Sequence, residues 1–291
     1  MTGCERAALL LQRFSEWWLQ KPLRGGFKMF RKLGFIFCLV ILLGASPASA
    51  FGKSKYKHRT DWKTVYQEEG FDKTPSCVVN VTSTIRLRRN QILDGKGCLY
   101  RWRGSGYPQK CHASGELSET EPRMFEMAPG SQIRNLRMEC SLDGILMDDD
   151  TVVSNVINQD CEEDCITTRG RNNTIINSKF YLCQDKCIQM NHATNVRIEN
   201  NFFKHANRPL SGSGATRGGA RPVYAMNNRC ENCDIMVRAQ SNHVIYASGN
   251  SLKRGECMFE THDRAIIYDR GRNRTEDADI NCSDGTRNVV P

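Results

Sequence analysis

Several absences narrow the classes of protein to which this 291-residue chain can belong. Its longest apolar run, at 33–45, is shorter than the ~20 residues that a transmembrane helix needs. The leucine-rich repeat signature L-x-x-L-x-L-x-x-N is missing, as is a second Cys-x-x-Cys at zinc-finger distance. The net charge after residue 50 is also small, because 34 basic residues are nearly balanced by 30 acidic ones. This small excess does not indicate nucleic-acid binding, but it suits a face that meets an acidic polymer.

The first 50 residues resemble an export signal. Basic residues precede the apolar run, and the small-x-small sequence ASA at 48–50 is the pattern that signal peptidase cuts. We interpret 29–50 as a signal peptide and 1–28 as an upstream extension, with translation starting at Met29. A short membrane anchor is the alternative, and the length of the run disfavours it. We expect a secreted protein, extracellular or periplasmic, without a stable membrane anchor.

Cysteine usage agrees with export. Twelve of the fourteen cysteines follow the signal segment, and an even number in an exported chain indicates disulfides. These cysteines are Cys77, Cys98, Cys111, Cys140, Cys161, Cys165, Cys183, Cys187, Cys230, Cys233, Cys257 and Cys282. Zinc binding by Cys230 and Cys233 is the competing interpretation, and the missing second pair weakens it.

An internal repeat of about 22 residues begins at Ser131. Its segments read SQIRNLRMEC, TVVSNVINQDC, NTIINSKFYLC and TNVRIENNFFKHA. Each opens with alternating apolar residues, passes an Asn or Ser, and resumes with an apolar residue. The steps are 20 residues from Ile133 to Val153 and 22 from Ile176 to Ile198. Short strands at this interval, without helical patterns between them, predict an all-β, single-stranded parallel β-helix with rungs of 20–22 residues.

We expect this solenoid to span 77–291, after an N-terminal segment at 51–76. Gly/Pro/Ser-rich stretches at 103–122 and 210–222 read as loops that project from it.

Residues one period apart should stack on successive rungs, ~4.8 Å apart. Cys161 and Cys183 are 22 residues apart, as are Cys165 and Cys187. Stacked cysteines fall within the Cα separation of ~4.4–6.8 Å that a disulfide tolerates. We therefore expect bridges between Cys161 and Cys183 and between Cys165 and Cys187, although sequence alone does not fix connectivity.

The same period aligns charged residues on one face. Asp143 lies 20 residues before Glu163, so it should sit beneath the Glu163–Asp164 pair, and 22-residue steps lead on to Lys186 and Arg208. Three converging carboxylates would repel one another unless a hard cation neutralises them, and an all-oxygen ligand set points to Ca²⁺. A solvated acidic patch paired with Lys186 is the alternative.

Arg169 lies five residues beyond Asp164 on the same rung. An arginine beside carboxylates is usually an ion-pair partner, and a catalytic role is the sharper hypothesis. The acidic run MDDD at 147–150 lies in the turn before the next rung. We interpret it as facing solvent, and a second cation site is the alternative.

Four motifs together carry a resemblance to a known family. They are DGI at 143–145, CEEDCITTRG at 161–170, DKCIQ at 185–189 and FKHANR at 203–208. In order and spacing they resemble the family 3 polysaccharide lyases, the small secreted pectate lyases. The resemblance implies a right-handed parallel β-helix, dependence on Ca²⁺, and β-elimination of polygalacturonate.

The resemblance also implies roles for individual residues. The implied calcium ligands are Asp143, Glu163 and Asp164. The implied substrate-binding residues are Lys186, Lys204, His205 and Arg208. The family's catalytic base falls on Arg169, where the family typically has lysine. Its later Lys-x-x-Arg pair falls on His205 and Arg208, with Lys204 as a substitute for the lysine.

These roles form a consistent chemistry. A Ca²⁺ ion that bridges the carboxylates and the substrate would make the C5 proton of a uronate more acidic, and Arg169 would accept that proton. Lys186 and Arg208 would neutralise neighbouring carboxylates and the developing charge. The sequence thus predicts a monomeric, secreted pectate lyase acting on polygalacturonate or a related acidic polysaccharide. The alternatives are a non-catalytic β-helix that binds acidic polysaccharide and a lyase for another uronan such as alginate.

Overall fold

The computed structural model describes most of the chain after residue 61. The described residues are 62–73, 75–104, 123–139, 141, 143–161, 163–212, 222–286 and 289–291. The predicted upstream extension and signal peptide lie outside them, as do Cys111, Cys140 and residues 105–122 and 213–221 of the two predicted loops. The start of the second predicted loop, 210–212, is instead the end of a strand, Arg208–Gly212. The chain divides into a unit at 1–53 and a unit at 54–291, and the fold below belongs to the second. No helix among the described residues is long and apolar enough to cross a bilayer.

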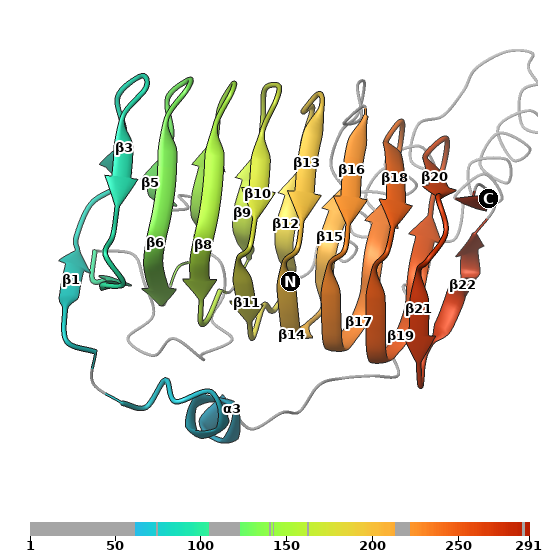
Figure 1. Cartoon of the computed structure of the whole chain (residues 1–291), viewed down its shortest axis with the longest axis horizontal. Helices are drawn as coiled ribbons and strands as arrows, with labels where there is room; N and C mark the ends of the chain where they lie inside the picture. The colour runs from blue at the N-terminus through green and yellow to red at the C-terminus, as the bar shows by residue number, and fades with distance from the viewer. Residues whose placement is uncertain are drawn as a thin grey trace, which may run out of the picture. The chain divides into compact units, whose positions relative to one another are not determined.

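The second unit is a parallel β-helix, as predicted (Figure 1). Its strands stack into three faces, and every strand pairing among the described residues is parallel. The first face contains β3 (Ile92–Asp94), the first half of β6 (Gln132–Glu139), the first half of β8 (Val152–Asn158), β10 (Thr174–Ile176), β13 (Val196–Glu199), β16 (Val223–Met226), β18 (Val244–Ser248), β20 (Ile266–Asp269) and β23 (Val289–Val290).

The other two faces complete each turn. The second contains β1 (Val78–Val81), β4 (Leu99–Trp102), the second halves of β6 and β8, β11 (Lys179–Tyr181), β14 (Phe202–Ala206), the first parts of β17 (Arg229–Ala239) and β19 (Ser251–Thr261), and β21 (Arg274–Glu276). The third contains β2 (Ile85–Arg86), β5 (Arg123–Glu126), β7 (Asp143–Met147), β9 (Asp164–Thr168), β12 (Lys186–Met190), β15 (Arg208–Gly212), the last parts of β17 and β19, and β22 (Asp279–Thr286). The right-handed sense stays a prediction.

The predicted repeat sets the register of the first face, with one correction. Ile133 pairs with Val153, and Val153 pairs with Ile175, as the period predicts. The next step is 23 residues and not 22, because Ile175, rather than Ile176, pairs with Ile198. The extra residue lies between Met190, which pairs with Thr168, and Thr194, which pairs with Arg171.

A short helix, α3 (Trp62–Glu68), begins the described chain and lies beside the second face. The Phe71 ring, just beyond it, makes an edge-on contact with Tyr181 of β11 at a centroid distance of 4.9 Å. The Tyr66 hydroxyl donates a hydrogen bond of 3.5 Å to the Glu139 carboxylate of β6. The N-terminal segment therefore covers part of the solenoid.

Aliphatic and aromatic side chains fill the inside of every turn. On the third face, Phe125, Ile145, Ile166, Ile188 and Leu210 stack in register and are buried. Full burial of one such side chain stabilises a fold by about 1.5–3 kcal/mol. This core keeps strands of the third face level, so polar residues at equivalent positions must also stack.

Asparagines explain the polar positions within the repeat. Residues at the turn between the first two faces adopt the left-handed backbone that asparagine tolerates better than most residues. These residues include Asn135, Asn155, Asn177, Asn200 and Asn227. Next to them runs a buried ladder in which the amide of Asn201 donates to Asn228, Asn228 to Asn250, and Asn250 to Asn273, at 2.9–3.1 Å.

We expect Asn228→Ala to lower the free energy of unfolding by about 3 kcal/mol. The Asn228 side chain accepts from the backbone N–H and amide of Asn201 and donates to the Ile198 carbonyl, and each buried group left unsatisfied costs about 1–3 kcal/mol. Urea unfolding measures the change. Asn207→Ala is the control, because its side chain makes one hydrogen bond near the surface, to the Gln184 carbonyl. Equal losses in the two variants would contradict a stabilising ladder.

Three disulfides among the described residues support the predicted export of the chain. Cys77 bonds to Cys98, Cys257 bonds to Cys282, and Cys230 bonds to Cys233. The Cys-x-x-Cys pair is therefore a disulfide in this structure and not half of a zinc site.

The expected Cys161–Cys183 and Cys165–Cys187 bridges are not formed in this structure, where all four residues are free thiols. Their stacking is as predicted, since Cys161 pairs with Cys183, and β9 pairs with β12 in the register that aligns Cys165 with Cys187. The closest recorded sulfurs, however, belong to Cys165 and Cys183, at 3.1 Å.

Candidate functional site

Five consecutive strands of the third face each begin with a charged residue. We call this set the charged column: Arg123, Asp143, Asp164, Lys186 and Arg208. Lys186 pairs with both Asp164 and Arg208, and Arg123 pairs with Asp143. The structure thus brings the predicted residues at 143, 164, 186 and 208 into line.

The register corrects one step of the prediction. Ile145 pairs with Ile166, so the step between β7 and β9 is 21 residues and Asp143 lies level with Asp164, not with Glu163. Glu163 directly precedes β9 and is half-buried, and its backbone carbonyl accepts the backbone N–H of Lys186 at 3.0 Å. The extra residue lies between Cys161, which pairs with Ser141, and Ile166, which pairs with Ile145, and it shifts the alignment by one.

The two column carboxylates are buried and flanked by bases. Asp143 and Asp164 are 6% and 7% exposed, which excludes a solvated acidic patch. Arg123 Nε lies 3.3 Å from Asp143 Oδ2, and Lys186 Nζ lies 3.0 Å from Asp164 Oδ1. The sequence had indicated carboxylates with no base between them, and it missed Arg123 because a loop interrupts the repeat before that residue.

Asp185 is the second residue that the sequence analysis missed. Its carboxylate accepts from Lys186 Nζ at 2.6 Å and from Arg208 Nη1 at 3.1 Å. It therefore links the two basic residues of the column. Asp185 also follows the 22-residue period, since it lies 22 residues after Glu163, but the sequence analysis traced only the step from Asp164 to Lys186.

Burial raises the pKa of Asp164 to about 6; Lys186 opposes this shift, and Asp143 and Asp185 reinforce it. Burial would lower the pKa of Lys186, but its ion pairs with Asp164 and Asp185 outweigh burial and raise it. Both pKa values are raised, but the effects are opposite: the shift disfavours the charged form of Asp164, chiefly through burial, and favours the charged form of Lys186. The negative charge of Asp164 is thus only partly compensated.

This donor set fits a hard cation in its chemistry. Two level carboxylates with Glu163 beside them offer the oxygen ligands that Ca²⁺ takes, and a cation would relieve the uncompensated charge at Asp164. Among the described residues, the acidic and histidine side chains do not gather three ligand atoms as closely as the cysteines do. Binding of Ca²⁺ by Asp143, Asp164 and Glu163 is therefore a proposal.

Gly144 allows β7 and β9 to approach closely beside the carboxylates. A Cβ atom at this position would lie 2.1 Å from the Cys165 carbonyl oxygen. We expect Gly144→Ala to lower the free energy of unfolding by about 1–3 kcal/mol through overpacking. Thermal and urea unfolding measure this loss.

The matched control is Gly97→Ala, where no atom lies within 4 Å of the added Cβ and only the left-handed backbone penalty applies. A Gly144→Ala loss no larger than that of the control would contradict the close approach.

Arg169 lies at the other end of β9 from Asp164. Five residues at ~3.3 Å each put their Cα atoms roughly 16 Å apart along the strand. The Arg169 side chain is exposed and lines a cavity of about 420 Å³ together with Arg86, Glu126 and Asp148. It forms no ion pair within the described ranges. The structure therefore places Arg169 beside its own cavity and does not bring it to the column.

The acidic run at 148–150 has two exposed residues, as predicted, and one residue with a local role. Asp149 Oδ2 lies 3.2 Å from Arg171 Nε on the next turn.

Lys204 and His205 differ in position from Arg208. Lys204 belongs to β14 on the second face, where its Nζ lies 2.8 Å from Glu69 Oε1 and 3.3 Å from Glu68 Oε2. It thus pairs with α3 and the residue after it. His205 follows with a left-handed φ of 55°, at the bend before the third face. Of the predicted substrate-binding residues, Lys186 and Arg208 share the column.

Comparison with known proteins identifies the family. Residues 69–252, more than half of the chain, match the family model described as Pectate lyase. The chain belongs to the pectate lyase family. This confirms the resemblance stated from its motifs and relates the protein to polysaccharide lyases. No curated protein matches the sequence significantly.

The chain has a weak similarity to two solved structures. The enzymatically active domain of tailspike protein 2 from bacteriophage CBA120 is 11% identical with a TM-score of 0.37, and the match covers 68% of this chain and 38% of that domain. An alginate lyase from Paenibacillus sp. str. FPU-7 is 13% identical with a TM-score of 0.40, covering 78% of this chain and 97% of the other. The chain thus spans well under half of the tailspike domain.

Proposed function

We propose that this member of the pectate lyase family is a secreted, Ca²⁺-dependent lyase that cleaves de-esterified polygalacturonate by β-elimination. The observation that carries the proposal is the charged column, where two buried carboxylates lie level with each other and are followed by Lys186 and Arg208. Three disulfides support the secreted location.

The column suits an anionic polymer that needs a bridging cation. Asp143 and Asp164, with Glu163, would hold Ca²⁺. When bound, this ion supplies Lewis acidity that makes the C5 proton of a uronate easier to remove. Lys186 and Arg208 lie on the next two turns, where they bind substrate carboxylates and stabilise the negative charge that develops as the proton leaves.

In the reaction, C5 loses its proton, the C4–O bond breaks, a C4–C5 double bond forms, and the leaving sugar takes its electrons with the glycosidic oxygen. We propose Arg169 as the proton acceptor, on the basis of the family motif. Lys186 is the rival, because its Nζ lies 3.0 Å from Asp164 whereas Arg169 lies at the far end of β9.

The ultraviolet absorbance of the unsaturated product tests the proposal. Polygalacturonate, methyl-esterified pectin and alginate are supplied separately, with Ca²⁺ or with a chelator. We expect product from polygalacturonate alone, and none with the chelator. Product from alginate would move the enzyme to another uronan. Calorimetric binding of polygalacturonate without any product would instead identify a non-catalytic binding protein.

A further inference from the structure

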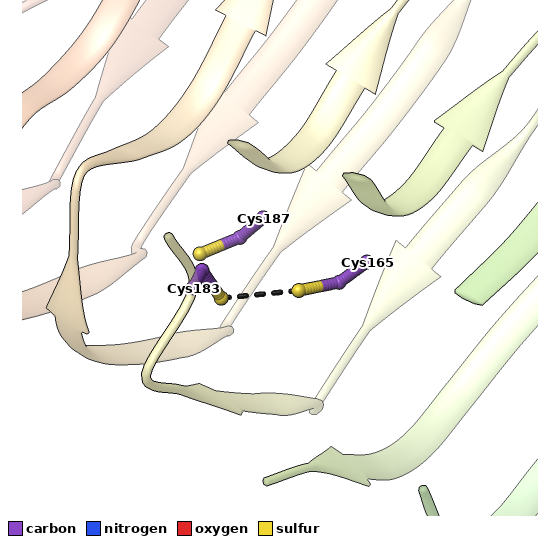
Figure 2. A group of neighbouring side chains, drawn as sticks. All are labelled: Cys165, Cys183 and Cys187. Atoms are coloured by element: carbon purple, nitrogen blue, oxygen red, sulfur yellow. Dashed lines mark hydrogen bonds between the residues drawn. The ribbon is translucent and has the colours of Figure 1, made fainter. Parts of the chain in front are cut away.

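Four buried cysteines gather at the base of the charged column. Cys161 pairs with Cys183 on the next turn, and Cys165 and Cys187 are the second residues of β9 and β12. All four side chains are buried free thiols. Figure 2 shows the sulfurs of Cys165 and Cys187 close to that of Cys183.

The sulfur spacing distinguishes a metal site from a covalent bond. The sulfurs of Cys165, Cys183 and Cys187 lie within 4.8 Å of one another, which by itself would suit a soft metal ion. However, the Cys165 and Cys183 sulfurs are only 3.1 Å apart. In a tetrahedral thiolate site with metal–sulfur bonds of ~2.3 Å, neighbouring sulfurs are about 3.8 Å apart. The spacing of these two sulfurs is shorter than in such a site, which favours a covalent bond between them over a shared metal ion.

The other cysteines of the solenoid indicate that the chain folds where disulfides can form. Three other cysteine pairs are disulfide-bonded, so the thiols at this cluster meet the same oxidant. We propose that Cys165 and Cys183 form a disulfide in the exported protein and that this bond positions the charged column. The two thiols lose two protons and two electrons, and a disulfide oxidant such as glutathione disulfide is reduced to two thiols by exchange.

The remaining two cysteines stay reduced. Cys161 is not one of the three residues whose sulfurs lie within 4.8 Å of one another, so the Cys165–Cys183 bond leaves Cys161 and Cys187 without a bridging partner. The model therefore predicts one bond and two thiols at this cluster.

The bond would act on the site through the neighbours of its cysteines. Cys165 directly follows Asp164, and Cys183 lies in the bend that leads to Asp185 and Lys186. A covalent link between them fixes the turn of β9 against that of β12, and so the 3.0 Å contact between Asp164 and Lys186. Cys165 and Cys183 are thus positioning residues, and this part of the inference rests on the proposed function.

Disulfide mapping of the full secreted chain tests the bond directly. Free thiols are alkylated at acid pH during denaturation, and the protein is then digested without reduction. Cleavage after Glu163 separates Cys161 from Cys165, and cleavage after Lys186 separates Cys183 from Cys187. We expect a Cys165–Cys183 peptide pair with alkylated Cys161 and Cys187. Any other pairing, or four alkylated thiols with one equivalent of bound zinc, would overturn the inference.

A double variant tests the positioning role. Cys165→Ser with Cys183→Ser should weaken Ca²⁺ binding by a factor of about 10–100, the effect of losing an outer-shell support, and excess Ca²⁺ should restore turnover. The matched control is Cys257→Ser with Cys282→Ser, which removes one disulfide two turns beyond Arg208 and should leave the Ca²⁺ affinity unchanged.

Equal Ca²⁺ affinities in both double variants and the wild type would overturn the positioning role. A wild-type protein that binds no Ca²⁺ would refute the proposed function and the positioning role together. The mapping result would still decide whether the bond exists.

Discussion

Replacing Asp164 by alanine should abolish Ca²⁺-dependent turnover while leaving the fold intact. Asp164 is proposed as a direct ligand, so its loss should weaken Ca²⁺ binding by more than the 10–100-fold that follows removal of an outer-shell partner. The fold should survive because Lys186 keeps Asp185 at 2.6 Å, so no buried cation is left unpaired. Burial already disfavours the charge of Asp164, so its removal carries little cost in stability.

Calorimetry for Ca²⁺ and thermal unfolding should be measured on the same samples. Asp149→Ala is the control, since it also removes a carboxylate paired with a basic residue of the next turn, Arg171, but outside the column. Asp143→Ala should behave like Asp164→Ala, because the two residues lie level on β7 and β9. Unchanged Ca²⁺ affinity in both column variants would reduce the cluster to a structural ion-pair network.

The period of the repeat predicted the strands better than their side-chain contacts. Alternating apolar residues fix which side of each strand faces the core, and this is why the pairing of Ile133 with Val153 could be predicted. Turn lengths carry no such signal. The two one-residue shifts, before β9 and before β13, both arise in turns, where an extra residue leaves the core pattern unchanged.

The missed residues show the same limit at the site. Arg123 follows a loop that breaks the period, so nothing in the sequence placed it under Asp143. Lys204 and Arg208 are four residues apart, yet a bend between them sends one to α3 and the other to the column. The free thiols depend on side-chain rotamers, which spacing does not determine.

Arg169→Ala should lower turnover by a factor of about 10² or more while leaving KM for polygalacturonate and Ca²⁺ affinity near wild type. This is the size of effect expected for loss of a general base. Arg169 is exposed and belongs to no ion pair within the described ranges, so its removal should cost little stability. Arg171→Ala is the control, because Arg171 is also exposed and lies two residues further along the chain.

Two further variants decide between Arg169 and its rival. If Arg169 accepts the proton, Arg169→Lys should keep measurable turnover with a lower pH optimum, since an amine loses its proton more easily than a guanidinium. Lys186→Met should then raise KM more than it lowers kcat, because it removes a contact to substrate. The opposite result, wild-type turnover in Arg169→Ala and a collapse of kcat in Lys186→Met, would assign the proton to Lys186. The 3.0 Å contact between Lys186 and Asp164 would then place the base directly beside the proposed cation, one turn from where the motif put it.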